Sequence, residues 1–270
     1  MNILKFEVID SPYDVRDFQI CAAGGDFPAE FRCPITVPIK NQGSKPTCVA
    51  HAVSSLLEYH YKRQTNSAES FSTEFIYGLR EPGYFMGDGM VIRNALNTVL
   101  KYGDPFNYEC AGNNSVKEAK ANIEEKIDEY KQMAYPHRIS TYYRCSTADA
   151  IKTALMEYGP VITSMNTYDG AKLVDDVYTY SPDANYGRHC VMIVGWNEKG
   201  WIIQNSWGKT YGGDGYFILP FDFKLNESWG ITDDILDNEL MIEKPSKFVI
   251  FFSSIINMIM NFFKQFTKQK

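Results

Sequence analysis

The stretch NQGSKPTCVAHAVSSLLEYHYKRQ, residues 41–64, begins as a polar loop and continues with apolar residues at helical spacing. Pro46 restricts the backbone and Thr47 has the side chain of an N-cap, so we expect a helix over about residues 48–63 with one buried face. Cys48 then lies in the first turn, where the helix dipole favours the nucleophilic thiolate. Most free cysteines are instead small buried hydrophobes, and this stretch alone leaves both roles open.

The composition is that of an ordinary globular chain. Its 270 residues, 44% hydrophobic and 22% charged, are enough for one large domain or for two lobes. A net charge of −6 without a basic block argues against nucleic acid as a partner. The six cysteines are not closely spaced and the four histidines are scattered, which predicts no disulfide framework, no metal site and no cofactor. With no secretory signal visible, we expect a cytoplasmic protein or delivery by a non-classical route.

The chain changes character at about residue 139. Before this point we predict helices capped by Ser72 and ended by Gly103, over residues 71–81, 90–103 and 115–133. A further helix is predicted over 146–160, starting with the capping-box residues Ser146 and Asp149. The runs VITSMN, VYTY, HCVMIVGW, GWIIQNSWG and GYFILP are typical of strands. A helical lobe followed by a sheet lobe indicates an α+β fold with a cleft between the lobes.

A thiolate nucleophile needs a base for its proton and a third group that orients the base. His189 opens the strand HCVMIVGW, and Asn205 follows the next strand sixteen residues later. Because a tight turn at 197–200 makes these strands neighbours, we expect both side chains to lie side by side. Trp207 is expected to shield their hydrogen bond from water.

The oxyanion that forms on a carbonyl under attack needs hydrogen-bond donors. The backbone N–H of Cys48 is one candidate, and the side chain of Gln42, six residues upstream, is the second. His51 and His60 lie on the same predicted helix, but a side chain one turn along cannot reach in front of the sulfur. We interpret both as packing or surface residues, and Cys190 as a core residue.

In this set of residues the chain resembles the papain-like cysteine peptidases. Residues 41–44 with Cys48 are similar to the family's oxyanion glutamine and nucleophile, and QNSWG with GGDGYFIL to its most specific segment. The resemblance covers about residues 35–220. It implies a two-lobe α+β fold, with a helical N-terminal lobe, an antiparallel sheet or barrel in the C-terminal lobe, and the active site in the cleft. The implied catalytic residues are Gln42, Cys48, His189 and Asn205; the implied substrate-binding residues are Gly89, Met90 and Trp207.

The expected organisation has four parts. They are an N-terminal extension (1–34), a helical lobe with the nucleophile (35–138), a β-rich lobe with the histidine and asparagine (139–240), and an apolar amphipathic tail (241–270). The chain looks like a divergent member of the family, because the usual long propeptide is missing. Its N-terminal stretch is too short and polar for a helical prodomain but able to lie across the cleft as an extended strand.

The tail is the feature that the resemblance does not explain. Sixteen uncharged residues separate Lys247 from Lys264. As a helix they span about 24 Å, short of the roughly 30 Å hydrocarbon core of a bilayer. We expect residues 247–266 to dock on the protein itself, on a partner protein or on a membrane surface, and to take no part in catalysis.

The predicted function is thiol-dependent hydrolysis of peptide bonds in a peptide or protein substrate, through a thioester acyl-enzyme. The helix dipole and His189 are expected to lower the pKa of Cys48 and to make it the fastest cysteine to alkylate at acidic pH. Two alternatives stay open. One is a peptide ligase or other acyl transferase on the same site, and the other is an interaction protein that keeps the fold and is recruited by its tail.

Overall fold

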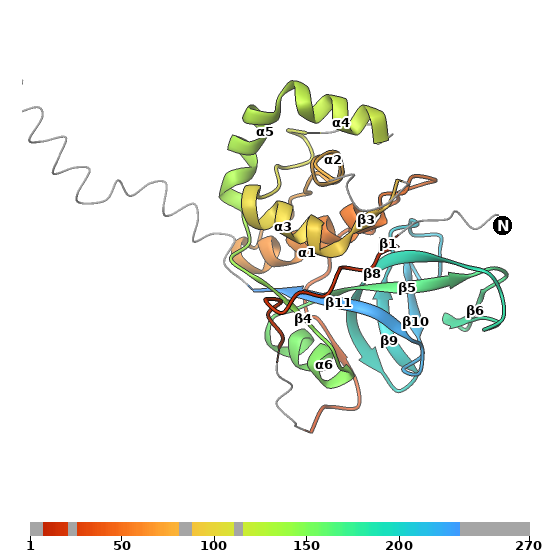
Figure 1. Cartoon of the computed structure of the whole chain (residues 1–270). Helices are drawn as coiled ribbons and strands as arrows, with labels where there is room; N and C mark the ends of the chain where they lie inside the picture. The colour runs from red at the N-terminus through yellow and green to blue at the C-terminus, as the bar shows by residue number, and fades with distance from the viewer. Residues whose placement is uncertain (1–7, 21–25, 81–87, 111–115, 233–270) are drawn as a thin grey trace, which may run out of the picture.

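A computed structural model of the chain describes residues 8–20, 26–80, 88–110 and 116–232. Helices gather on one side of a mostly antiparallel sheet, so the expected α+β architecture is confirmed (Figure 1). The helices of this group are α1 (Cys48–Thr65), α2 (Thr73–Gly78), α3 (Ile92–Tyr102), α4 (Val116–Glu125), α5 (Ile127–Ala134) and the 3₁₀ turn η1 (Tyr135–His137). The tail residues 247–266 and Cys21 lie outside the described residues.

Nine strands in the described part of the chain form one sheet, in the order β4-β11-β5-β8-β9-β10-β7-β6 with β2 paired to β8. All pairs are antiparallel except β7 with β10. The bounds are β2 (Phe31–Arg32), β4 (Tyr142–Arg144), β5 (Val161–Tyr168), β6 (Lys172–Val174), β7 (Val177–Thr179), β8 (Tyr186–Asn197), β9 (Gly200–Gln204), β10 (Tyr216–Leu219) and β11 (Leu225–Ile231). The five predicted strand runs all lie in this sheet. Residues 31–32, which we had grouped with the N-terminal extension, belong to it as well.

Helix α1 is the central element of the molecule. Its residues from Cys48 to His60 are all buried, so the expectation of one buried face is wrong. The reason is position: α1 contacts α2 and α3 on one side and β5 and β8 on the other. Its polar side chains therefore need internal partners. Lys40 Nζ lies 2.6 Å from Glu58 Oε1, and Ser54 Oγ donates to the Phe71 carbonyl at 3.0 Å.

Some helix ends lie where the sequence predicts them, and others do not. Ser72 caps α2 by accepting from the Phe75 N–H at 3.1 Å, and Gly103 ends α3 at φ +79°, both as predicted. Helix α6 (Ala148–Glu157) starts one residue later than expected, because Thr147 rather than Ser146 accepts from the backbone at its start. The predicted helix over residues 115–133 is two helices, α4 and α5, separated at Lys126.

The hairpin β8–β9 determines where the residues after it lie. Its turn is tight, as predicted, with Asn197 paired to Gly200. Gly200 has φ +149°, and a Cβ there would meet the Leu219 carbonyl oxygen at 2.2 Å. The pairing shifts by one residue between Ile193 and Gly195, a β-bulge. Strand β9 ends at Gln204, and the segment with Asn205 and Trp207 follows directly.

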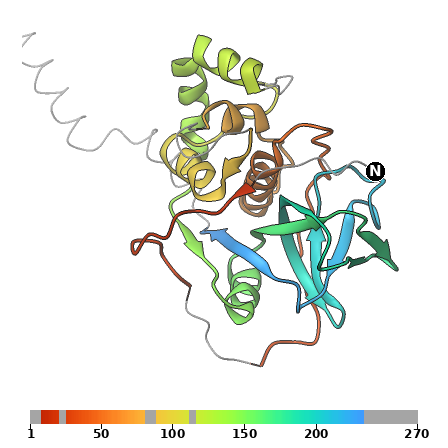
Figure 2. The same ribbon diagram turned by 45° about the vertical axis from the view of Figure 1, so that its right-hand side comes forward.

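The N-terminal residues 8–17, which we call the strap, run along the boundary between the helices and the sheet in both views (Figures 1 and 2). Strand β1 (Val8–Ile9) pairs in parallel with β3 (Met90–Val91) of the helical region. On the sheet side, the carboxylate of Asp10 forms an ion pair with Arg188. The strap therefore binds both halves of the molecule. Within the described ranges, no helix is both long and apolar enough to cross a membrane.

Candidate active site

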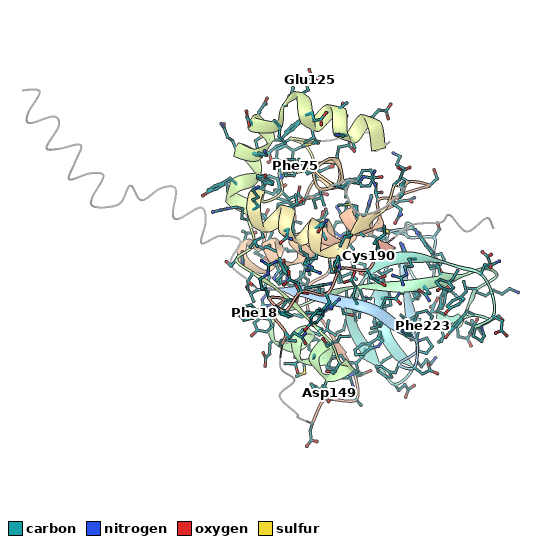
Figure 3. All side chains as sticks on the ribbon, in the orientation of Figure 1. Phe18, Phe75, Glu125, Asp149, Cys190 and Phe223 are labelled. Carbon is teal, nitrogen blue, oxygen red and sulfur yellow. The ribbon has the colours of Figure 1, made fainter. Side chains whose placement is uncertain are left out.

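Cys48 is the first residue of α1 and is 2% exposed. Thr47 occupies the N-cap position, but its hydroxyl makes no capping bond, contrary to the prediction. The first N–H groups of a helix have no partner inside it, so the Cys48 N–H remains available as a donor. The backbone amide of Cys190, the residue after His189, acts on the Cys48 sulfur. Figure 3 shows Cys190 where the helices meet the sheet.

His189 and Asn205 meet as the sequence predicts. His189 Nε2 lies 2.8 Å from Asn205 Oδ1, and the Ser206 N–H donates to the same oxygen at 2.8 Å. Because this oxygen accepts, Nε2 carries the imidazole hydrogen and Nδ1 keeps its lone pair. The Trp207 ring stacks on the His189 ring with centroids 4.5 Å apart and planes 19° apart. The pair is thus shielded from water by the expected residue.

Gln42 is held by four hydrogen bonds, one of which the Lys45 N–H donates to its carbonyl at 3.3 Å. Its N–H donates to the Ser206 carbonyl at 2.8 Å, and its Oε1 accepts from Ser206 Oγ at 2.6 Å. Its Nε2 donates to the Lys45 carbonyl at 2.9 Å, which uses one of the two amide hydrogens. Ser206 therefore fastens the loop before α1 to the segment that carries Asn205. The sequence analysis did not single out Ser206, although it lies inside the QNSWG segment.

The electrostatics of the site differ from the expectation. Burial raises the pKa of the Cys48 thiol to about 11, and nearby backbone amides, that of Cys190 first, only partly oppose it. Burial also lowers the pKa of His189 to about 4, against the effect of its bond to Asn205. The predicted lowering of the Cys48 pKa is therefore wrong for this structure. With these pKa values the thiol and the imidazole are both neutral near pH 7.

Two of the three residues expected to bind substrate, Gly89 and Met90, are covered by the chain itself. Met90 is 2% exposed and pairs with Val8 of the strap. The Gly89 carbonyl accepts from Arg80 Nη1 at 2.8 Å. The structure thus brings the strap to the segment that the sequence marked as the substrate loop.

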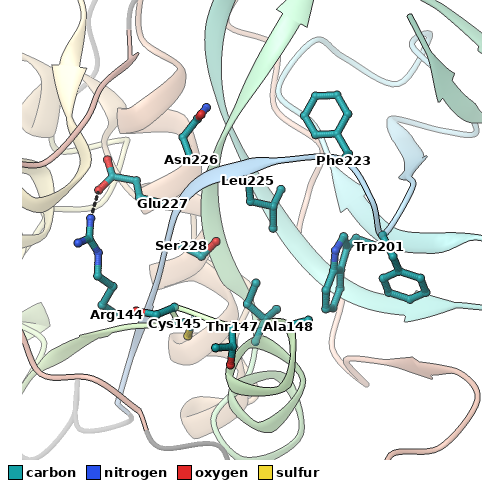
Figure 4. A pocket seen from close by; sticks show the side chains of 13 residues that line it. Arg144, Cys145, Thr147, Ala148, Trp201, Phe223, Leu225, Asn226, Glu227 and Ser228 are labelled. Carbon is teal, nitrogen blue, oxygen red and sulfur yellow. Dashed lines mark hydrogen bonds and ion pairs between the residues drawn. The ribbon is translucent and has the colours of Figure 1, made fainter. Parts of the chain in front are cut away.

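The remaining cysteines of the described residues and one further pocket are the other candidate groups. The cysteines 33, 110, 145 and 190 are buried and free, and no metal-ligating cluster occurs within the described residues. A pocket of about 350 Å³ opens beside the start of α6, lined by Trp201, Phe223 and Leu225 (Figure 4). Its carboxylate, Glu227, is engaged by Arg144 at 3.3 Å and by the Trp229 Nε1–H at 2.9 Å. This pocket offers no nucleophile–base pair.

Comparisons with known proteins identify the class. The model of the papain family of cysteine proteases matches residues 29–235. An uncharacterized peptidase C1-like protein of Acanthamoeba polyphaga mimivirus is 26% identical over 268 residues, 87% of this chain and 79% of that protein. Cathepsin K of Mus musculus is 25% identical over 217 residues, 73% of this chain and 59% of cathepsin K.

A solved structure agrees on the fold. Xylellain, a cysteine protease from Xylella fastidiosa, matches with a TM-score of 0.74 at 20% identity, over 85% of this chain and 96% of xylellain. The chain is therefore a cysteine peptidase with the two-lobe α+β fold expected from its sequence. It belongs to the papain family.

Proposed function

We propose that the protein hydrolyses peptide bonds with Cys48 as nucleophile, His189 as acid–base and Asn205 as the residue that orients His189. The observation that carries the proposal is the 2.8 Å contact between His189 Nε2 and Asn205 Oδ1, beside a cysteine at an uncapped helix start. That contact leaves the lone pair of Nδ1 as the base. It also adds no charge, which suits an imidazole that must gain and lose a proton.

The first half of the reaction forms the acyl-enzyme. The Cys48 sulfur bonds to the peptide carbonyl carbon while its proton passes to His189. The carbonyl oxygen becomes an oxyanion, held by the Cys48 N–H and by the second hydrogen of Gln42 Nε2. When the oxyanion collapses, the C–N bond breaks and His189 returns the proton to the leaving amine. A thioester remains on Cys48.

The second half releases the acyl group. Water attacks the thioester carbon and gives a proton to His189. The carbon–sulfur bond then breaks, the carboxylic acid leaves, and the proton returns to the sulfur. In this proposal the backbone of Gly89 and Met90 binds the extended peptide, and Trp207 walls the site beside His189. An extended peptide would need the edge of β3 that Val8 and Ile9 occupy.

The test is reaction with an epoxide inhibitor of thiol proteases, followed by mass mapping of the modified residue. We expect the label on Cys48, and no turnover of a small peptide substrate by Cys48→Ala with the fold retained. Cys145→Ala is the matched control, because Cys145 is also buried and free but lies beside the separate pocket at α6. Label on another cysteine, or turnover by Cys48→Ala, would overturn the assignment.

A further inference from the structure

His51 is a buried histidine beside the proposed catalytic residues. It is 5% exposed, and its Nδ1 lies 2.9 Å from the carbonyl oxygen of Thr47, one helical turn back. A carbonyl oxygen only accepts, so Nδ1 carries the hydrogen and Nε2 keeps a lone pair. The pKa of His51 is lowered to about 4, mainly by burial and to a smaller extent by the nearby Lys40 and His189. His51 is therefore a neutral hydrogen-bond acceptor next to the active site.

Asn205 has an unused donor in the same place. Its Oδ1 accepts from His189 and from the Ser206 N–H, which leaves the amide group Nδ2 to bond elsewhere. Nδ2 is buried and has no hydrogen-bond partner among the described residues. An unsatisfied buried N–H costs roughly 1–3 kcal/mol, so a partner for Nδ2 stabilises this position of the side chain.

A small cavity brings the acceptor and the donor to one space. It is lined by His51, Ser55, Cys190, Gln204, Asn205 and Ser206, among others. Its volume of about 10 Å³ is the space of a single water molecule. Polar side chains from α1 and from the end of β9 line it, which is the environment that holds buried water.

We propose that one water in this cavity accepts a hydrogen bond from Asn205 Nδ2 and donates one to His51 Nε2. His51 is then a positioning residue: it holds the amide plane of Asn205, which holds the ring of His189. The proposal rests on the catalytic roles proposed above. It does not require His51 to contact substrate, because the imidazole is buried and lines the cavity.

Three variants test the kinetic consequence. His51→Phe keeps an aromatic ring and removes the acceptor, so kcat is expected to fall about five- to ten-fold, with KM changing less than two-fold. His51→Gln supplies a new acceptor and is expected to recover most of kcat. His60→Phe is the control, because His60 is the other buried imidazole of α1 but does not line the cavity. Melting temperatures establish that each variant is folded.

A measurement on the unmodified protein keeps the proposal testable if the variants do not fold. Nitrogen-15 spectra are expected to show His51 as the Nδ1–H tautomer, and the Asn205 side-chain amide in contact with a long-lived water. The Nε2–H tautomer, or no water contact, would overturn the proposal. So would full kcat in folded His51→Phe, or an equal loss in His51→Phe and His51→Gln. Absence of any peptidase activity would overturn the proposed function instead, since the spectra do not depend on turnover.

Discussion

Ser206 shows how much one small side chain decides at this site. Through its carbonyl and hydroxyl it binds Gln42, and through its N–H it binds Asn205 Oδ1. The proposed oxyanion donor and the residue that orients the base are thus held by the same serine. A shift of the loop with Gln42, or of the segment with Asn205, would therefore displace both side chains.

The first prediction at the residue scale concerns Gln42. Gln42→Ala removes a side-chain donor to the oxyanion, and kcat is expected to fall by about 10²-fold with a smaller change in KM. Ser206→Ala is the graded comparison, since it keeps the donor but loses the 2.6 Å bond that holds it. Its loss of kcat should be smaller. Steady-state kinetics on a small peptide substrate measure both, and an unchanged kcat in folded Gln42→Ala would refute the assigned role.

The second prediction at this scale concerns the thiol itself. With the pKa of Cys48 raised to about 11, the thiolate fraction grows as pH rises. The rate at which iodoacetamide modifies Cys48 should then increase about ten-fold per pH unit between about pH 6 and 9. Mass mapping against time gives the rate for each cysteine. Cys145, with its pKa raised to about 12 by burial, is the internal reference and should react more slowly. A rate at Cys48 that does not change with pH would mean a preformed thiolate–imidazolium pair.

At the scale of elements, the strap occupies the edge of β3. Besides the pairing of Val8 with Met90, the Ser11 hydroxyl accepts from the Arg93 N–H at 3.3 Å, and the Ser11 N–H donates to Glu227 Oε1 at 3.2 Å. These bonds tie the strap to both lobes. A peptide that pairs with the same edge has to displace it.

Displacing the strap is therefore predicted to raise activity. Val8→Asp places a carboxylate where the side chain is 2% exposed, which unseats β1 because a buried unpaired charge is costly. We expect kcat/KM on a peptide substrate to rise by roughly ten-fold or more, mainly through KM.

The matched control for this variant is Val15→Asp. Val15 lies in the strap as well but is 82% exposed, so its kinetics should not change. Equal kinetics for folded Val8→Asp and the wild type would show that the strap does not compete with substrate.

At the scale of the whole molecule, buried histidines make stability depend on pH. His51, His137 and His189 each have a pKa lowered to about 4, with burial as the largest cause. The unfolded chain binds these protons at higher pH than the folded protein does, so stability is lost as pH falls from about 6.5 to 4. Asp104 works in the opposite direction, because burial raises its pKa.

His137 allows this prediction to be tested away from the active site. It packs against Phe71 and Phe106, so Phe is a suitable replacement for its ring. The urea midpoint of His137→Phe should fall less between about pH 6.5 and 4 than that of the wild type, since one proton-binding site is gone. An equal or steeper fall of the urea midpoint would contradict the predicted effect of His137 protonation on stability. The wild type and His137→Phe are first compared at pH 7. This comparison gives the stability lost with the hydrogen bond between His137 and the Asp104 carbonyl, which is then kept apart from the pH effect.

Local patterns in the sequence were enough to predict much of the fold. The period of apolar residues predicted α1 and α3, and the alternation with turns predicted β5 and β7 to β10. Strands β4 and β6 were not predicted because three residues carry too little of a pattern, and the seven-residue β11 was not predicted either. The tight turn before Gly200 and the spacing of His189 and Asn205 predicted their contact, because a hairpin relates residues that are near in sequence.

Features that depend on contacts between distant segments of the chain were decided only by the tertiary structure. The bulge near Val194 leaves no local signal, since it depends on how β8 fits its neighbours. Burial of α1 on all sides, and with it the raised pKa of Cys48, arises from elements packed around the helix. The strap on β3 pairs residues about eighty positions apart. By itself the sequence singled out the residues proposed to carry the chemistry, because each lies in a short motif of its own. Their protonation and access depend on burial, which only the assembled chain determines.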